Sequence, residues 1–188
     1  MAPHAGRTEL GPAHGRILLR TFREGLAASA GHDLTIEATR WSGELEVGED
    51  LAPVSLTVKI DMTALTVREG SGGLKPLTDS DRREIGATAR KVLAVSRHPE
   101  ASFAATSFQP GADGGGVIGG DLTLAGVTRP ARLQVAGTGG DGYLATVSIV
   151  QSSFGITPYR GFFGALKVRD AVDVEIEADL SGGEQAGP

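Results

Sequence analysis

The 188-residue chain contains no cysteine. Disulfide bonds and thiolate-ligated metal sites are therefore excluded, and the redox state of its compartment is left undetermined. Its four histidines show neither an H-x-H nor an H-x-x-x-H spacing, so the sequence gives no support for a histidine metal site. We expect neither a metal nor a cofactor.

Long apolar runs and an excess of basic charge are also missing. No run of about 18 apolar residues occurs, so the sequence predicts no integral membrane segment. Lysine and arginine number 18 against 23 acidic residues, and this net charge of −5 argues against a nucleic-acid partner. Residues 1–15 lack the apolar stretch of a signal peptide. As written, the chain is expected to be cytoplasmic, or exported if a signal has been removed.

Aromatic residues are scarce, at 5% of the chain, whereas there are 28 glycines. Glycine thus reaches about 15%, twice its usual share of roughly 7%. Without a collagen-like repeat, so many glycines indicate numerous turns and bulges, which are typical of all-β proteins. The length fits one domain with a substantial core.

The segment 119–135, GGDLTLAGVTRPARLQV, predicts two strands joined by a tight Ala125-Gly126 turn. If Leu124 pairs with Val127, the apolar residues from 118 to 135 share one face and the polar ones take the other. Arg129 is the polar residue that falls on the apolar face. A sheet with one dry and one wet face is predicted.

Alternating apolar residues predict further strands over 16–23, 33–39, 54–62, 101–108, 143–150 and 172–180. Between Thr39 and Trp41 the apolar residues change from even to odd positions, which predicts a bulge or corner. One helix is predicted over about 79–95, with Thr78 as N-cap and a single apolar stripe that includes Ile85.

These elements predict an all-β protein with eight antiparallel strands and one inserted helix. Closing the sheet into a barrel removes its free edges, and a barrel of this size holds packed side chains or one elongated ligand. We assign the barrel domain to residues 13–180. The polar, aperiodic segments 1–12 and 181–188 are predicted to be flexible tails.

Several blocks of the sequence resemble the YceI-like proteins. They are REIGATARKVLAVSRHPEASFAATSF, GGDLTLAGVTRPARLQV, ATVSIVQSSFGI and VRDAVDVEIEADL, together with GHDLTIEATRWSGEL, and they cover most of residues 15–180. The resemblance implies a lipocalin-like barrel whose apolar lumen takes a polyisoprenoid or another long-chain lipid. It implies no established enzymatic activity and no metal.

The chain departs from the resemblance at one motif. Where many members carry an R-x-D-F-G pattern, this chain has Gln151, Ser153, Phe154 and Gly155. If the charged pair sets the polarity of the pocket in relatives, the pocket here is expected to be more neutral, and the ligand to differ.

The predicted lumen lining is drawn from the inward positions of the strands and the segment that follows 143–150: Leu18, Leu34, Ile36, Trp41, Leu56, Val58, Ile60, Phe103, Leu122, Leu124, Val147, Ile149, Phe154 and Ile156. Tyr159, Phe162 and Phe163 either line or gate the lumen, or form an ordinary cap. Arg129 either binds an anionic head group at the lumen mouth or is turned to solvent by Pro130.

The predicted function is binding, sequestration or transport of a long-chain apolar ligand, with an isoprenoid or other long-chain lipid as partner. One alternative is a barrel filled by its own side chains that serves as a structural or protein-interaction module. Another is an enzyme acting on a lipid through Arg129, His32 or Tyr159, but no catalytic constellation accompanies them, so we expect no enzyme. Gly31-His32-Asp33 is predicted to be a turn. Pairing of two barrels as a homodimer stays open.

Overall fold

The computed structural model describes residues 5–111 and 114–181. Its main feature is one curled antiparallel sheet of 11 strands in the order β1-β5-β6-β8-β9-β10-β11-β14-β2-β4-β7. The strands are β1 (Gly6–Leu10), β2 (Gly15–Thr21), β4 (Asp33–Ala38), β5 (Trp41–Val47), β6 (Pro53–Asp61), β7 (Leu65–Ser71), β8 (Glu100–Pro110), β9 (Gly116–Leu124), β10 (Val127–Gly139), β11 (Gly142–Val150) and β14 (Ala171–Asp179).

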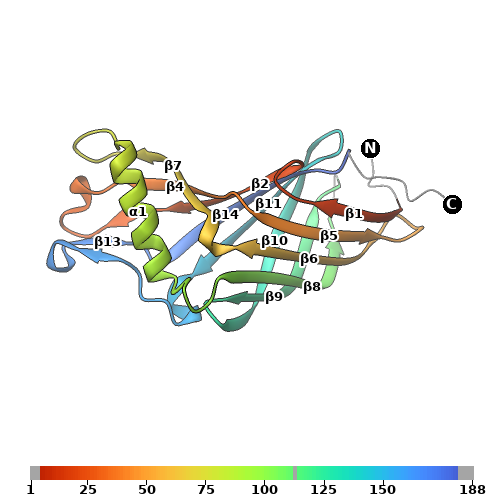
Figure 1. The fold of residues 1–188 in the computed structure, drawn as a ribbon. Coiled ribbons are helices and arrows are strands. Elements are labelled where there is room, and N and C mark those ends of the chain that lie inside the picture. Colours follow the sequence, from red (N-terminus) through yellow and green to blue (C-terminus); the bar gives the residue numbers. More distant parts are fainter. Residues whose placement is uncertain (1–4, 112–113, 182–188) are drawn as a thin grey trace.

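Most of the smaller elements gather at one end of this sheet, and one 3-10 helix lies at the bend between β6 and β7 (Figure 1). A three-stranded sheet is formed by β12 (Arg160–Gly161), β13 (Leu166–Val168) and β3 (Arg23–Glu24). Short 3-10 helices are η1 (Ala28–Ala30), η2 (Met62–Ala64), η4 (Gln151–Phe154) and η5 (Phe162–Gly164). The long helix α1 (Asp79–Val92) lies across the same end and packs against β7.

The sheet closes through two bent strands. Only residues 39 and 40 separate β4 from β5, and only η2 separates β6 from β7. Before and after the bend, the hairpin of these two bent strands has different neighbours: β4 pairs with β2 at one end of the hairpin, whereas β6 pairs with β8 at the other. The bent hairpin therefore joins the two sides of the sheet. If β4 and β5 are counted as one bent strand and β6 and β7 as another, eight strands surround the interior, and β1 is an additional strand at the edge. The predicted all-β barrel with one inserted helix is confirmed, and only the strand count differs in detail.

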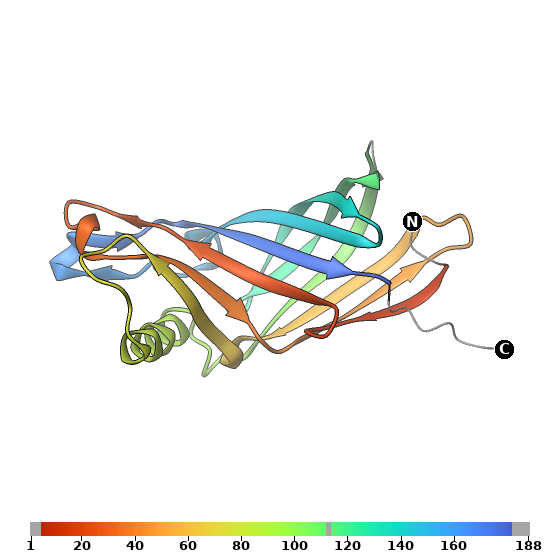
Figure 2. The same ribbon diagram turned by 90° about the horizontal axis from the view of Figure 1, so that it is seen from above.

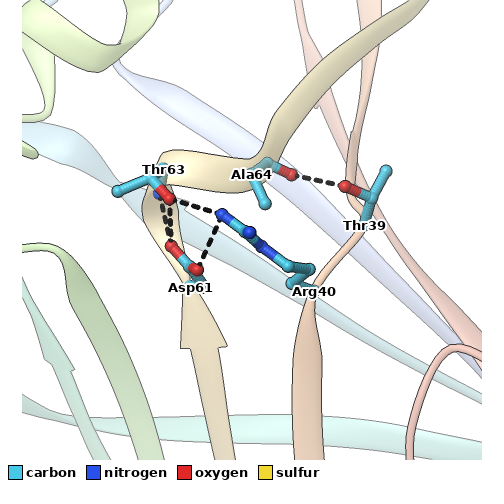
Figure 3. Close-up of polar contacts among 5 residues, drawn as sticks. All are labelled: Thr39, Arg40, Asp61, Thr63 and Ala64. Atoms are coloured by element: carbon cyan, nitrogen blue, oxygen red, sulfur yellow. Dashed lines mark hydrogen bonds and ion pairs between the residues drawn. The ribbon is translucent and has the colours of Figure 1, made fainter.

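A small polar cluster fixes the bend (Figure 3). The backbone N–H and the hydroxyl of Thr39 both donate to the carbonyl of Ala64, at 2.9 and 3.0 Å. Arg40 Nη2 donates to Thr63 Oγ1 at 2.8 Å and forms an ion pair with Asp61 at 3.0 Å. Hydrogen bonds from Thr63 lower the pKa of Asp61. The corner predicted between Thr39 and Trp41 is thus confirmed, and its partner is the matching bend at η2.

The helix begins where the sequence predicted. The Thr78 side chain accepts from the Asp81 backbone N–H at 3.2 Å, and the Asp81 carboxylate accepts from the Thr78 N–H at 2.8 Å. This reciprocal pair is a capping box, which satisfies donors that the first helical turn leaves free. The helix ends at Val92, three residues before the predicted boundary. Within the described ranges, no helix is long and apolar enough to cross a membrane.

The prediction of a flexible segment over 1–12 is wrong for residues 6–10, because β1 pairs with β5 along its whole length, from Gly6 opposite Val47 to Leu10 opposite Gly43. A five-residue strand is too short to show a clear alternation in the sequence. Residues 1–4 and the predicted tail from 182 onward lie outside the described residues. The predicted first strand over 16–23 is divided between β2 and β3.

One ion pair on the outer face ties β2 to β14. Arg20 donates from Nε and Nη2 to the two carboxylate oxygens of Glu175 at 2.7 and 2.8 Å, a bidentate arrangement. These hydrogen bonds lower the pKa of Glu175 from its ordinary value of 4.5, against a smaller opposing effect of burial. The folded state therefore favours the ionised carboxylate more than the unfolded chain does.

The pH dependence of stability should report this pair. A carboxylate whose pKa is lowered on folding stabilises the protein above its unfolded pKa, and this contribution is lost as the pH falls through the folded pKa. Between about pH 7 and about pH 3, the free energy of unfolding should therefore fall less in Glu175→Gln than in the wild type. Urea unfolding at the two pH values measures the difference. Equal losses of unfolding free energy in Glu175→Gln and the wild type would contradict the assignment.

Candidate ligand-binding cavity

The barrel encloses a cavity of ≈ 1040 Å³. Inward side chains from neighbouring strands form its wall, as in the row Val58, Phe103 and Leu122, which are direct partners across β6, β8 and β9. This volume matches the upper end of the range of about 300–1,000 Å³ that ligand pockets occupy. Every strand of the 11-stranded sheet contributes to the wall, with β1, β4 and β7 supplying one residue each: Leu10, Ala38 and Leu65.

The lining is almost wholly apolar. Besides aliphatic residues, phenylalanine, proline and glycine, the described lining residues with polar side-chain atoms are Trp41, Asp50, Gln109 and Tyr143. No lysine, arginine or histidine occurs among the described residues that line it. Three of the four polar side chains, Asp50, Gln109 and Tyr143, come from hairpin loops or strand ends near them.

The open end of the cavity lies between three hairpin loops. The β5–β6 loop contributes Asp50 and Leu51, the β8–β9 loop contributes glycines 111, 114 and 115, and the β10–β11 loop contributes glycines 139 and 140. In Figure 2 these loops lie at the end of the molecule opposite α1. Because glycine has no side chain, this rim leaves the cavity wide at its mouth. This rim was not predicted, although its glycine clusters are visible in the sequence.

The other end of the barrel is solid. Ile36, Val67 and Val95 are buried there, and Ile85 and Leu93 pack against the same core. Helix α1 and the chain that follows it supply three of these side chains. The molecule therefore combines the two arrangements that the sequence left open: it is filled at the helix end and hollow at the loop end.

The predicted lining residues divide between these regions. Nine of them line the cavity: Trp41, Leu56, Val58, Ile60, Phe103, Leu122, Leu124, Val147 and Ile149. Leu34 and Ile36 lie on the inner face but belong to the packed core at the helix end. The even-to-odd change at the bend was therefore interpreted correctly, whereas the sequence did not show how far the core extends.

Leu18 was assigned to the wrong face. It is opposite Glu37 on β4 and Glu175 on β14, so it lies on the outer face of the sheet, where it is nevertheless buried. The cavity is lined instead by its neighbours Ile17 and Leu19. Three consecutive apolar residues, Ile17 to Leu19, carry no alternation, so the sequence gave no basis for choosing a face.

The aromatic segment does not line the lumen. Tyr159, Phe162 and Phe163 have exposed fractions of 39%, 63% and 113%. Phe162 and Phe163 also have left-handed backbone conformations, with φ of 47° and 55°. Phe154 and Ile156 are buried, but outside the main cavity. The prediction that Phe154 and Ile156 line it is wrong, and of the alternatives left open for Tyr159, Phe162 and Phe163, lining is ruled out. The reason is that the chain leaves the barrel after β11 and folds into η4, η5 and the small sheet.

Arg129 has the predicted register but not a place in the main cavity. Its partner on β9 is Leu122, as expected, yet the side chain is exposed and Nε donates to the carbonyl of Ser153 at 3.2 Å. It borders a second hollow of ≈ 550 Å³ on the side of the barrel.

The remaining polar candidates have structural roles. The ring of His32 is 2.8 Å from the carbonyl of Lys75, which holds the loop before α1. Gln151 is buried and donates to the carbonyl of Arg169 at 3.0 Å. Since Gln151 and Ser153 do not line the cavity, their departure from the charged motif does not set its polarity. In the described part of the chain, no group of three or more His, Cys, Asp or Glu residues could hold a metal ion.

An antiparallel barrel with one covering helix and an apolar interior defines the class of lipocalin-like barrels. The family model of the YceI-like domain matches residues 10–180, and the chain belongs to that family. This agrees with the resemblance found in the sequence.

Two solved structures share the fold. BcnA of Burkholderia cenocepacia has a TM-score of 0.63 at 14% identity, over 88% of this chain and 96% of BcnA. The YceI protein of Campylobacter jejuni has a TM-score of 0.59 at 15% identity, over 80% of this chain and 84% of the other. No curated protein matches the sequence.

Two identical substitutions should distinguish the solid end from the hollow end. Ile36→Ala removes a buried side chain from the packed core and should cost about 2–5 kcal/mol of unfolding free energy. Ile60→Ala only widens an existing cavity and should cost less than about 2 kcal/mol, since fewer packing contacts are lost. Urea unfolding of delipidated protein measures both. Equal losses would show that the loop end is packed as tightly as the helix end.

Proposed function

We propose that this protein binds, sequesters or transports a long-chain apolar molecule, an isoprenoid or acyl lipid, in the barrel cavity. The observation that supports the proposal is the cavity of ≈ 1040 Å³ with its almost wholly apolar wall. Exposing such a wall to water is unfavourable, and an apolar ligand replaces that water. In this proposal the protein does not modify the ligand, which is released with the same chemical structure that it had when it bound.

The shape of the cavity favours an elongated ligand. Along β8, lining residues extend from Ala101 to Gln109 and Pro110. At about 3.3 Å per residue, eight steps along a strand cover roughly 26 Å. A compact molecule would leave much of such a space empty, whereas an extended chain would contact the wall along its whole length.

The source of affinity would be transfer of the chain from water. Burial contributes about 0.8 kcal/mol per methylene, so a long chain binds well without any specific hydrogen bond. Selectivity would then depend on chain length and on the polar groups at the mouth, Asp50 and Tyr143.

Binding can be followed with the protein's own fluorophore. Trp41 is the single tryptophan of the chain and lines the cavity. Titration with unbranched alcohols of increasing length should change its fluorescence, with affinity rising about fourfold per methylene until the cavity is filled. An affinity independent of chain length would contradict the proposal.

A blocking variant tests the location. Ala145 lines the cavity, and Thr146 next to it points to the outer face opposite Glu175. Ala145→Phe should weaken binding by about tenfold or more because it fills the lumen, and Thr146→Phe should not. Native mass spectrometry and an organic extract of freshly purified protein provide an independent measurement. A bare mass, an empty extract and no binding by the wild type would favour a structural or interaction module instead.

A further inference from the structure

The barrel wall has a gap between β10 and β11. Their ladder joins only Gln134–Gly139 to Gly142–Thr146. Beyond it, residues 127–133 of β10 pair with β9 alone, and residues 147–150 of β11 pair with β14 alone. Two strands that are neighbours in the sheet thus separate toward the β9–β10 turn.

Pro130 accounts for part of this separation. The two-residue turn makes Leu124 and Val127 a hydrogen-bonded pair, so the odd residues of β10 bond to β9 and the even residues face β11. Pro130 is therefore at a position whose N–H would point at β11, and proline has none. Proline occurs within sheets where a strand has a free edge. The sequence itself favours an unpaired edge here.

The gap lies beside a second hollow that shares part of its wall with the main cavity. The second hollow, of ≈ 550 Å³, is bordered by residues 129–132 of β10, 147–150 of β11, and Ser153 and Phe154 of η4. Four of its lining residues also line the main cavity: Leu122, Ala131, Val147 and Ile149. At its far edge the hydrogen bond from Arg129 to Ser153 joins β10 to η4. We call this opening the lateral window.

Arg129 gives the lateral window a positive charge that the main cavity lacks. Arg132, also at its border, donates from Nη2 to Gln109 Oε1 at 3.2 Å and so reaches across the outer face. Arg129 uses Nε, and among the described residues its Nη1 and Nη2 have no hydrogen-bond partner. Its planar fork is free to receive a carboxylate or phosphate. The end mouth carries the carboxylate of Asp50 instead, which repels such groups.

We propose that the lateral window is the route by which a single-chain amphiphile with an anionic oxygen-bearing head group enters the barrel. The tail passes between Ala131 and Val147 into the cavity, and Arg129 holds the head group at the window. This inference rests on the proposed function, because it requires that a long apolar chain occupies the barrel.

Head-group recognition is tested with a matched pair of ligands, hexadecanoic acid and hexadecan-1-ol, titrated against Trp41 fluorescence. Hydrogen bonds to a charged group contribute enough that Arg129→Gln should weaken binding of the acid by about tenfold and leave the alcohol unchanged. Arg160→Gln is the control: Arg160 is an exposed arginine that lines neither hollow, and its replacement should alter neither affinity. Equal weakening for acid and alcohol would show a merely structural role for Arg129 and overturn the assignment.

The route is tested by bridging the window. Because the chain has no cysteine, Arg132→Cys with Ser148→Cys creates a single reactive pair, and continuing the register from Gln134 opposite Thr146 places these residues across the gap. A short bismaleimide bridge should slow both association and dissociation of hexadecan-1-ol by about tenfold, with little change in affinity. The same bridge between Gln134→Cys and Thr146→Cys, where the strands already pair, should change neither rate.

The outcomes separate the two proposals. If the wild type binds neither ligand, the proposed function fails and the inference fails with it. If both ligands bind but the window bridge leaves the rates unchanged, ligands use the end mouth and the inference is overturned alone. Slower exchange with the window bridge, together with the acid-specific loss in Arg129→Gln, supports the lateral route.

Discussion

Closure of the sheet by the bent hairpin is the constraint on which the other features depend. A strand presents alternate side chains to opposite faces, and in this molecule the apolar face is kept from water because the sheet curls around it. Here the curl is completed because β4 pairs with β2 on one side of the barrel and β6 pairs with β8 on the other. β5 continues β4 past the bend, β7 continues β6, and the two bent strands pair with each other on both sides of the bend. The polar cluster around Arg40 fixes the bend at both strands (Figure 3). Without this corner, the inner faces of β2 and β8 would not enclose a common interior.

The division of that interior into a solid and a hollow part follows from the position of the helix. Helix α1 and the residues after it cover the end formed by β4 and β7, where their side chains complete the core with Ile36 and Val67. Within residues 5–111 and 114–181, no comparable element covers the loop end, where the rim is rich in glycine. Close packing at the helix end therefore supplies stability that the loop end lacks. The cavity at the loop end can stay empty because the core at the helix end remains packed whether or not the cavity is filled.

Much of the fold could be predicted, because local rules act directly on it. The hairpin register around Leu124, the N-cap at Thr78 and the corner after Thr39 all follow from turn chemistry and alternation. The site was only partly predictable. Alternation identifies the inner face but not which part of it is packed, so Ile36 and Ile60 look equivalent in sequence. It fails where apolar residues are consecutive, as at Leu18. It also says nothing about where a glycine-rich segment turns, which is why the sequence could not decide whether Phe162 and Phe163 line the lumen or lie outside it.

The short strand β1 has a consequence for how the molecule behaves among its own copies. It occupies the edge of β5 beside the cavity mouth, so the backbone groups of β5 are satisfied within the chain. An uncovered strand edge is a template on which another polypeptide can add a strand. Gly6–Leu10 thus moves the outer edge of the sheet from the seven-residue β5 to the five-residue β1, and a shorter edge offers another polypeptide fewer backbone groups to pair with.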